Sequence, residues 1–572
     1  MRYLALALDY DGTLALDGRV DASTIEALER VVQSGRRLLL VTGRELDDLQ
    51  RVFGRLDLFE YVVAENGALL YRPAARESIP VGEAPPGELV RELRRRGVAP
   101  LSVGSVIVAT WRPNETAVLE TIRDLGLEWQ VIFNKGAVMA LPSGVNKGSG
   151  LSVALKQMGL SPHNVAGIGD AENDHAFLSL CECAVAVANA LPAVQERADV
   201  VTRADHGAGV IEFIERLLGD DLASLENTLQ RHHLPLGKDA EGVDLALSPH
   251  GTSLLIAGSS GAGKSTIARA LLERLRDARY QFCVIDPEGD YGEFPGAVTF
   301  GDTDHPPNPE SVLQLLEAPE SNAVVNLLGV ALADRPQFFA GLLPQLLDLR
   351  LHTGHPHWLL IDEAHHMFPE GWAPAQGLVP RELGSMVMVT VHPEMLARPI
   401  AEPVDVVIGV GDAGADTVSA FAKRVGDATP PLPDRPREEG EALVWLRRRD
   451  RAPFYFRSEQ PRDEQHRHRR KYAQGDVGDK SFFFRGPEGK LNLRAQNLAL
   501  FAQIAEGVDD GTWLHHLRQG DYSRWFREAI KDEELAFRTE QIEAQQHLRA
   551  FESRAAIIKA IEDRYTAPAE RG

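Results

Sequence analysis

The sequence predicts an α/β protein built from several domains, and three observations carry this prediction. Its 572 residues exceed the length of one domain, at about 150 residues per domain. Short apolar runs alternate with amphipathic segments twice along the chain, which is typical of parallel sheets flanked by helices. Hydrophobic residues make up 44% and charged residues 25%, the composition of a folded globular protein.

Charge and cysteine content exclude several classes of protein. Lys and Arg number 61 against 83 Asp and Glu, and the net charge of −22 excludes a uniformly basic nucleic-acid coat. Three cysteines are too few for a disulfide framework and fit a reducing cytoplasm. Asp9 and Asp11 interrupt the apolar N-terminus, and no apolar stretch reaches the roughly 20 residues that cross a bilayer. We therefore expect a cytoplasmic protein with no membrane segment.

The first sheet pattern extends to residue 219 and is interrupted once. Its strand-like runs lie at residues 3–11, 37–44, 61–67, 165–171 and 184–189. A proline-rich stretch and further strand-like runs separate the third of these from the fourth. We therefore expect a core domain of residues 1–74 and 146–219, with an inserted α/β cap at residues 75–145.

The remaining chain divides into a second sheet domain and a smaller one. After a linker at residues 220–242, alternating strands and helices are predicted for residues 243–460. A polar linker at residues 461–480 precedes a predicted hairpin and helices at residues 481–572, a small, mainly helical domain. Its aromatic side chains at helical spacing, which predict core packing, are Tyr522, Trp525 and Phe526.

Two carboxylates follow the first predicted strand. Asp9 and Asp11 stand two residues apart before a glycine, at a strand end where open α/β sheets bind ligands. One carboxylate can attack phosphorus and form an aspartyl-phosphate, while the other protonates the leaving oxygen and later activates water. Because these charges repel one another and the phosphate, we expect Mg²⁺ at the site.

Three later stretches would complete such a site. Thr42 ends the second strand, where its hydroxyl and backbone N–H could hold a phosphate oxygen. Lys147 stands at a predicted helix start, where its ammonium could neutralise the nucleophile and the phosphoryl group. Asp170 ends another strand, and Asn173 and Asp174 follow one turn later as candidate metal ligands.

The ordered strings DYDGT, TGR, NKG and GDAEND resemble the motif set of the haloacid dehalogenase superfamily. Residues 1–217 resemble its Cof-like branch, and the strings AENGA and VANALPAVQERADVVT share that resemblance. The resemblance implies a Rossmann-like fold and a Mg²⁺-dependent phosphatase, with Asp9 as nucleophile and Asp11 as acid and base. It implies Thr42 and Lys147 as phosphate ligands. The implied metal residues are Asp9, Asp11, Asp170, Asn173 and Asp174.

A glycine-rich string marks the second sheet domain. GSSGAGKST follows the apolar run SLLIA and precedes an amphipathic helix, which satisfies G-x-x-x-x-G-K-[ST] in the strand–loop–helix context of a P-loop. The glycines let backbone N–H groups face phosphates, Lys264 reaches the β- and γ-phosphates, and Ser265 binds Mg²⁺. The predicted ATP-binding residues are Gly258, Gly261, Gly263, Lys264, Ser265, Thr266 and Asp362.

A second carboxylate pair ends the apolar run WLLI. Asp362 is placed to hold Mg²⁺, and Glu363 to polarise an attacking water, which favours ATP hydrolysis. Thr390 and His392 end another strand, where they could sense the γ-phosphate or simply form a turn. For the histidine pairs we expect packing rather than metal binding, because neighbours on one element point in different directions. These pairs are His232 with His233, His365 with His366, and His515 with His516.

Residues 243–458 resemble the HerA/FtsK group of ring ATPases through FCVIDPEGDYGEF, IDEAHH and GEALVWLRR. The resemblance implies a hexameric ring that acts on DNA, completed by an arginine from a neighbouring subunit. The candidate arginines are Arg381, Arg398 and Arg424. A local charge excess between Arg447 and Lys471 could contact nucleic-acid backbone, an acidic neighbour or only solvent. The last part resembles a small uncharacterised module, which implies no activity.

The leading hypothesis is a two-headed enzyme, a phosphomonoester hydrolase joined to an oligomeric ATPase. Its expected partners are ATP, a phosphorylated small molecule or nucleic-acid end, DNA, and further copies of the chain. One alternative is a kinase–phosphatase that heals nucleic-acid ends. The other is a nucleotide-gated scaffold or sensor whose phosphatase-like head only binds.

Overall fold

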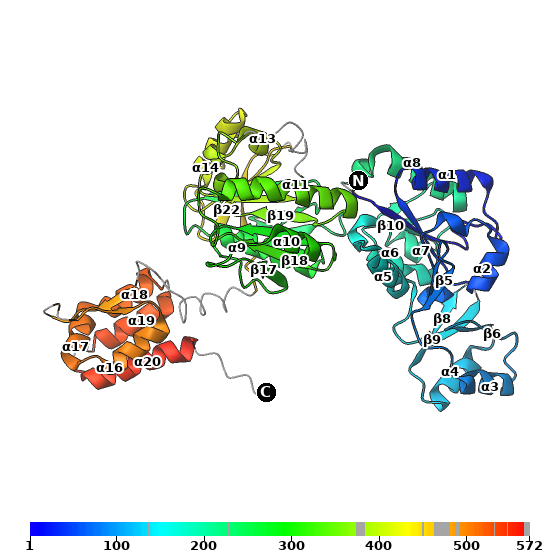
Figure 1. Cartoon of the computed structure of the whole chain (residues 1–572), viewed down its shortest axis with the longest axis horizontal. Coiled ribbons are helices and arrows are strands. Elements are labelled where there is room, and N and C mark those ends of the chain that lie inside the picture. The colour runs from blue at the N-terminus through cyan, green and yellow to red at the C-terminus, as the bar shows by residue number, and fades with distance from the viewer. Residues whose placement is uncertain are drawn as a thin grey trace. The chain divides into compact units, whose positions relative to one another are not determined.

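The computed structural model describes residues 1–134, 136–226, 228–372, 384–448, 451–462, 481–487, 489, 491–530, 532–545 and 547–565. The chain forms two compact units, Met1–Glu459 and Gln460–Gly572 (Figure 1). The first unit contains two large sheets, and we call the parts around them the head (residues 1–229) and the body (residues 234–459). None of the helices in the described part of the chain is both long and apolar enough to span a bilayer.

The head is built on an eight-stranded sheet in the order β12-β11-β10-β1-β2-β3-β4-β5. Its parallel strands are β1 (Ala5–Asp9), β2 (Arg37–Val41), β3 (Tyr61–Ala64), β10 (Val165–Gly169), β11 (Cys183–Ala186) and β12 (Val200–Val201). Its helices are α1 (Ala22–Gln33), α2 (Leu46–Val52), α5 (Lys147–Met158), α6 (His175–Leu180), α7 (Pro192–Gln195) and α8 (His206–Asp220). Every residue of β1 and β10 is buried, as expected for central parallel strands.

Two antiparallel strands extend the head sheet beyond the boundary expected from the sequence. β4 (Leu69–Arg72) pairs with β3, and β5 (Glu77–Pro80) pairs with β4 from Leu69↔Pro80 to Arg72↔Glu77. Residues 77–80, which we expected in the cap, therefore belong to the head sheet. The run ESIP is too short for its hydrophobic pattern to show which sheet it joins.

The cap is a separate four-stranded antiparallel sheet with two helices on one side. The strand order is β6 (Ser102–Val103), β7 (Val108–Trp111), β9 (Ala137–Pro142) and β8 (Trp129–Asn134). Helices α3 (Gly87–Arg95) and α4 (Glu115–Asp124) bury Leu89, Leu93, Val118 and Ile122 against it. Figure 1 shows these elements together at one end of the head.

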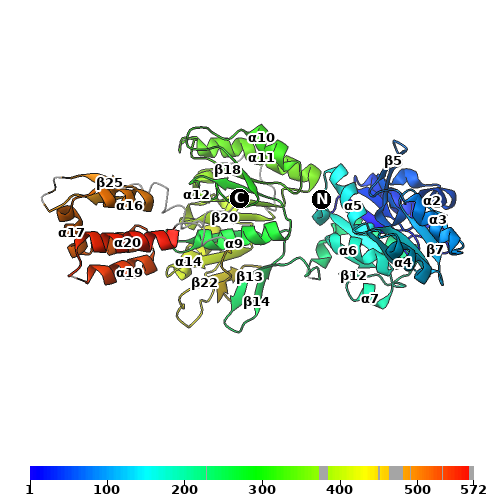
Figure 2. The same cartoon turned by 90° about the horizontal axis from the view of Figure 1, so that it is seen from below.

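The body contains an eleven-stranded sheet. Its order is β14 (Asp244–Leu247), β13 (Leu234–Asp239), β23 (Phe454–Ser458), β22 (Glu441–Leu446), β21 (Val406–Val410), β15 (Ser253–Gly258), β20 (Met386–Thr390), β19 (Trp358–Ile361), β16 (Phe282–Asp286), β18 (Asn322–Asn326) and β17 (Ala297–Phe300). The strands from β21 to β17 are parallel, and the other four form an antiparallel edge. Figure 2 shows β13 and β14 at the edge opposite β18.

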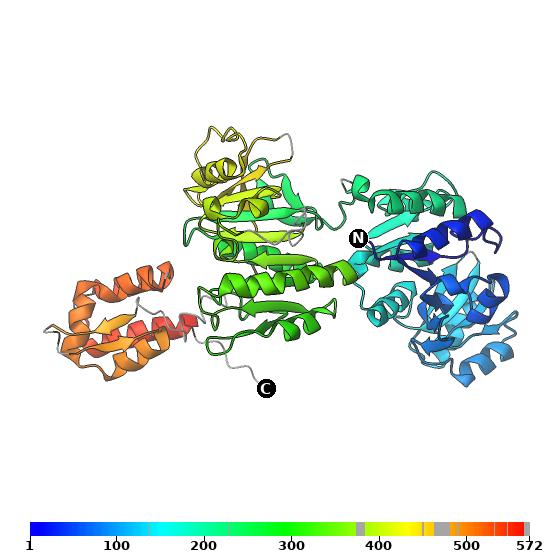
Figure 3. The same ribbon diagram turned by 45° about the horizontal axis from the view of Figure 1, so that its top comes forward.

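Helices cover both faces of the body sheet, drawn in green and yellow in Figure 3. They are α9 (Lys264–Asp277), α10 (Pro309–Leu316), α11 (Arg335–Thr353), α12 (Ala364–Met367), α13 (Arg398–Ala401) and α14 (Gly414–Val425). One buried cluster contains side chains of α9 and another contains side chains of α11, so the sheet has a core on each face. The body sheet also includes β13, which lies inside the expected linker, because Leu234 and Leu236 are buried there.

The second unit combines a hairpin with helices. β24 (Phe482–Phe484) pairs antiparallel with β25 (Leu493–Ala495). The helices are α16 (Leu498–Gly507), α17 (Asp510–Gln519), α18 (Asp521–Glu528), α19 (Glu533–Glu543) and α20 (Ala550–Tyr565). Tyr522, Trp525 and Phe526 are buried in its core, as their helical spacing predicted.

Candidate active sites of the head and the body

Parallel strands bring the predicted residues of the head to one sheet edge. Asp9 ends β1, Thr42 follows β2 and Asp170 follows β10, and these three strands are adjacent and parallel. Lys147 is the first residue of α5, whose N-terminus is capped by the Asn146 side chain. This N-terminal capping by Asn146 fixes the first residue of α5 and therefore the backbone position of Lys147.

Lys147 joins two of these carboxylates. Its Nζ lies 2.5 Å from Asp9 Oδ1 and 2.5 Å from Asp174 Oδ1, and all three side chains are buried. Burial alone would lower the pKa of Lys147, but Asp174 and Asp9 raise it above its ordinary value. Burial and the repulsion from Asp174 raise the pKa of Asp9. The site therefore holds more negative charge than one ammonium can offset.

The charge and the donor atoms at this site fit a hard divalent cation. One carboxylate oxygen from each of Asp9, Asp170 and Asp174 lies within 4.8 Å of the other two, and all three residues are buried. Oxygen ligands of this kind suit Mg²⁺. Asp174 Oδ2, however, accepts the N–H groups of Asp170 and Ala171, while its Oδ1 accepts from Lys147. Asp9 and Asp170 are thus the better placed ligands, and Asp174 positions the lysine and the loop.

Asp11 is bound by Arg44. Arg44 donates to both of its oxygens, through Nε at 2.7 Å and Nη2 at 2.7 Å. The two-bond pairing fixes this carboxylate. Asp11 is not among the three carboxylates whose oxygens gather within 4.8 Å, so the structure does not group it with the candidate metal ligands. Thr42 also differs from expectation, because its backbone N–H already donates to Val63 O at 2.8 Å. Only the Thr42 hydroxyl is left for a phosphate oxygen.

Two buried asparagines, Asn66 and Asn173, also belong to the candidate site of the head. Asn173 Nδ2 donates to Asn66 Oδ1 at 3.1 Å, and both residues are buried. Asn173 Oδ1 and Asn66 Nδ2 have no hydrogen-bond partner among the described residues, which leaves an acceptor and a donor for a ligand or water. Asn66 adopts a left-handed φ of 58°, a strained conformation common at functional sites. Its signal in the sequence is the string AENGA, to which we had assigned no role.

Glu65 connects the head to the cap. Its carboxylate accepts the N–H groups of Ser105 at 2.9 Å, Val106 at 2.9 Å and Ile107 at 3.1 Å, and it is 2% exposed. A Cβ at Gly104 would lie 2.7 Å from the Glu65 carboxyl carbon, so glycine is required for this approach. Nothing in the sequence pattern pairs these residues, which are about forty positions apart.

The P-loop occupies the end of β15. Gly258 ends the strand, Gly261 lies in the loop, and Gly263 adopts a φ of 103° as it caps α9. Lys264, Ser265 and Thr266 begin α9, and the Lys264 ammonium donates to Ser259 O at 3.0 Å. Burial lowers the pKa of Lys264. Backbone N–H groups at a helix start and a lysine at the same point can hold phosphates.

The sheet order places the predicted carboxylates beside this loop. β20 lies between β15 and β19, and all three strands are parallel, so Asp362 after β19 and Thr390 on β20 share the edge with the P-loop. Asp362 Oδ1 accepts the Glu363 N–H at 3.0 Å. Burial, followed by the nearby charges of Glu363 and Asp286, raises the pKa of Asp362 to about 8. A cation at this carboxylate would restore its charged form.

Glu363 and Thr390 are linked through His365. Glu363 has a left-handed φ of 41°, and its Oε2 lies 3.3 Å from His365 Nδ1. The same nitrogen lies 3.0 Å from Thr390 Oγ1. His392 is attached to Thr390 through its backbone N–H at 3.0 Å. Burial lowers the pKa of His365 to about 4, so the ring is neutral near pH 7, and its hydrogen bond is the one to Thr390.

The candidate finger arginines have partners within the body. Arg398 Nε donates to Glu402 Oε1 at 2.7 Å, and Arg424 Nη1 donates to Glu370 Oε1 at 2.6 Å. Arg381 lies outside the described residues. Neither of the two described arginines has a recorded contact with the P-loop of its own chain.

Four arginines in the described part of the basic segment are paired with acids. The ion pairs are Arg447 with Asp427 at 2.7 Å, Arg448 with Asp405 at 2.8 Å, Arg451 with Asp239 at 3.1 Å and Arg457 with Glu438 at 2.6 Å. Residues 449–450 and 463–480 of this region lie outside the described residues. These four arginines therefore present less net charge than the sequence count suggested.

Comparisons with known proteins find relatives of both the head and the body. A family model described as haloacid dehalogenase-like hydrolase matches residues 6–83 and 106–214, and one described as AAA ATPase domain matches residues 243–389. The phosphoglycolate phosphatase of Methanothermobacter thermautotrophicus is 33% identical over 224 residues, which cover 38% of this chain and 99% of that protein. The phosphoglycolate phosphatase of Methanopyrus kandleri is 31% identical over 220 residues, which cover 37% of this chain and 95% of that protein.

A solved haloacid dehalogenase-like hydrolase from Bacteroides thetaiotaomicron is 21% identical, covers 38% of this chain and 99% of that one, and has a TM-score of 0.34. The family assignment rests on the sequence relatives, because nearly their whole length is matched at 30% identity or more. The chain therefore belongs to the haloacid dehalogenase-like hydrolases through its head, and it is an enzyme that combines a phosphatase of this type with an ATPase domain.

Proposed function

We propose that the head hydrolyses a phosphomonoester through an aspartyl-phosphate on Asp9. The observation that carries this proposal is the buried Lys147, bonded to Asp9 and Asp174 beside Asp170. The lysine holds the nucleophile and supplies positive charge where a phosphoryl group would arrive. Mg²⁺ held by Asp9 and Asp170 would offset the remaining negative charge of the carboxylates and the phosphate.

The chain's own residues divide the chemistry between two steps. An Asp9 oxygen forms a bond to phosphorus while the bond from phosphorus to the leaving oxygen breaks, and Asp11 gives that oxygen its proton. Asp11, now a carboxylate, takes a proton from water as the water oxygen attacks phosphorus and the bond to Asp9 breaks. Arg44 orients Asp11 between these steps through its two hydrogen bonds. Free phosphate and the alcohol are the products.

The substrate we propose is a small phosphomonoester. The relatives of the head act on phosphoglycolate according to their names, so phosphoglycolate is the first compound to assay. The cap bonds to the head through Glu65, close to the strained Asn66, and so places its own residues beside the site. We propose that the cap selects the organic part of the substrate.

Replacing the nucleophile tests the head directly. Asp9→Asn should lower phosphatase turnover by about 10³-fold or more, because an amide cannot form the aspartyl-phosphate. ATP hydrolysis should stay near the wild-type rate, and Lys264→Ala serves as the reciprocal control that loses ATPase but keeps phosphatase activity. Unchanged phosphatase turnover in folded Asp9→Asn protein would refute covalent catalysis.

We also propose that the body is a HerA/FtsK-like motor that hydrolyses ATP as a ring, most simply a hexamer. Support comes from Asp362 and Glu363 beside the P-loop and from Arg398, whose side chain is 63% exposed and available to a neighbouring subunit. An arginine supplied in trans can raise turnover by roughly 10³ to 10⁵. Light scattering at assay concentration tests this, and full ATPase turnover by a monomer would contradict it.

DNA is the polymer that the ring proposal suggests. The four described arginines between Arg447 and Arg457 pair with acids of the body. A DNA contact would therefore depend mainly on residues 463–471, which lie outside the described residues. DNA-stimulated ATPase turnover that falls with added salt is the expected signature.

A further inference from the structure

Several polar side chains surround a buried glutamate where the head, the linker and the body meet. Glu182 is 1% exposed, immediately before β11 of the head. Its Oε2 lies 2.7 Å from His163 Nδ1 and 2.8 Å from the Tyr280 hydroxyl. Its Oε1 lies 3.0 Å from Arg2 Nη2 and 3.1 Å from His250 Nε2. Neither catalytic site uses this cluster.

Both ring nitrogens of His163 face oxygen atoms that accept hydrogen bonds. Its Nδ1 faces the Glu182 carboxylate, and its Nε2 lies 2.9 Å from the carbonyl oxygen of Ala278. A neutral imidazole has one N–H and cannot donate to two acceptors. When its Nε2–H donates to Ala278, the Nδ1 lone pair faces the Glu182 carboxylate, and a cation bound by both groups would satisfy them.

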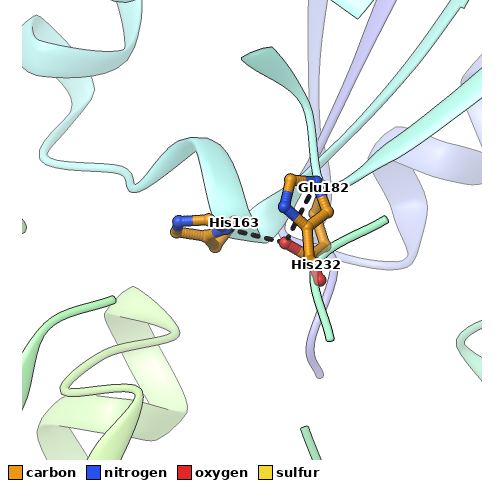
Figure 4. Close-up of side chains that lie close together, drawn as sticks. All are labelled: His163, Glu182 and His232. Carbon is orange, nitrogen blue, oxygen red and sulfur yellow. Dashed lines mark hydrogen bonds and ion pairs between the residues drawn. The ribbon is translucent and has the colours of Figure 1, made fainter. Parts of the chain in front are cut away.

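His232 places a second imidazole nitrogen, which has no hydrogen-bond partner among the described residues, near the Glu182 carboxylate. Its Nε2 lies 3.9 Å from Glu182 Oε2, too far for a hydrogen bond, and that buried nitrogen has no hydrogen-bond partner among the described residues. Figure 4 shows the two imidazole rings on either side of the Glu182 carboxylate.

The separations suit one metal ion. The three ligand atoms lie within 4.8 Å of one another. Around a tetrahedral Zn²⁺ with bonds of about 2.0 to 2.2 Å, ligand atoms are roughly 3.4 Å apart. The observed 2.7 Å and 3.9 Å contacts of the two histidine nitrogens with Glu182 Oε2 lie on either side of that value.

We propose that His163 Nδ1, the Glu182 carboxylate and His232 Nε2 bind a transition-metal ion of the Zn²⁺ class. Two imidazoles and a carboxylate are a known zinc ligand set, whereas Mg²⁺ prefers oxygen ligands alone. The Ala278 carbonyl fixes the His163 tautomer and the Tyr280 hydroxyl holds the carboxylate, as partners of metal ligands commonly do. His163, His232 and Tyr280 are among the residues that line a cavity of about 710 Å³.

The position of the ligands defines what the ion would do. His163 and Glu182 belong to the head, His232 belongs to the segment that leads to the body, and the supporting groups at Ala278 and Tyr280 belong to the body. The ion would therefore fix the connecting segment to the head and hold the body against both. Its role is structural, because Arg2, His250 and Tyr280 already surround the carboxylate.

Metal content of the full chain tests the proposal. Protein stripped with a chelator is equilibrated with Zn²⁺ in a large excess of Mg²⁺, which occupies the carboxylate site of the head and the P-loop, and bound zinc is then counted. The wild type should bind one Zn²⁺ per chain, and Co²⁺ should give the visible absorption of a tetrahedral nitrogen-ligated ion. His232→Gln should lose both signals.

Matched variants separate ligand loss from misfolding. His232 is partly exposed, so His232→Gln should keep wild-type phosphatase turnover and circular dichroism. His352→Gln, at an exposed histidine, should bind zinc as the wild type does. Tyr280→Phe should weaken zinc affinity about 10- to 100-fold through the group that supports Glu182. No zinc bound by the wild type, or unchanged zinc affinity in His232→Gln, would overturn the proposal.

Discussion

Replacing Glu65 with Gln tests whether one buried carboxylate holds the cap on the head. The wild-type side chain accepts three backbone N–H groups, one through Oε1 and two through Oε2. If the amide oxygen of Gln still accepts the N–H groups of Val106 and Ile107, the amide NH₂ group must face the N–H of Ser105, and two donors cannot form a hydrogen bond. One hydrogen bond to a charged group is lost, worth about 1.5 to 3 kcal/mol, and the other two weaken to neutral strength. We expect the attachment to lose about 3 kcal/mol.

Hydrogen exchange measures this loss at the place where it occurs. A loss of about 3 kcal/mol corresponds to roughly 10²-fold faster exchange for the amides of residues 105–107, provided that the cap opens locally. Phosphatase kcat/KM should fall as well, because the cap no longer stays beside Asn66, while ATPase turnover should not change. Glu77→Gln, the same chemical change at an exposed position of β5, is the control. Wild-type exchange rates at residues 105–107 in Glu65→Gln would refute the reasoning.

Two further predictions concern the body. Glu363→Gln should retain ATP binding and lose most hydrolysis, because it keeps the shape and removes the carboxylate, whereas Lys264→Ala should weaken binding; equal loss of binding in both would contradict these roles. Because the pKa of Asp362 is raised from 3.8 to about 8, its contribution to stability is complete below pH 3.8 and is lost as pH rises through about 8. Without nucleotide, Asp362→Asn should therefore gain stability over the wild type from pH 5 to pH 8, by up to about 1.4 kcal/mol per pH unit. Thermal unfolding at several pH values checks this, and a difference that does not vary with pH would disprove it.

The sequence predicted the positions of residues that end parallel strands. Asp9, Asp170 and Asp362 each follow an apolar run, and parallel pairing brings such positions to one edge whatever the loops between them do. Lys147 was predictable for a related reason, since it begins a helix whose first residue the Asn146 cap fixes. The local sequence pattern and the order of the strands are enough to predict where these residues lie.

Side-chain pairing across long separations was not predictable. The sequence could not show that Arg44 would bind both oxygens of Asp11, because an arginine reaches many positions through its flexible side chain. It could not show that Glu65 would bind the cap at residues 105–107. We expected His232 and His233 to pack rather than bind metal, but adjacency in sequence says nothing about His163 and Glu182, which come from other elements of the head.

One buried strand separates the metal cluster proposed at Glu182 from the phosphatase site. His163 stands just before β10, and Asp170 stands just after it. β10 is hydrogen-bonded to β1 on one side and β11 on the other, and all five of its residues are buried. A strand held in this way moves as a unit, because bending it would break hydrogen bonds that no water could replace. His163 and Asp170 therefore lie at opposite ends of one buried strand of the head, and the strand fixes the distance between the two groups of side chains.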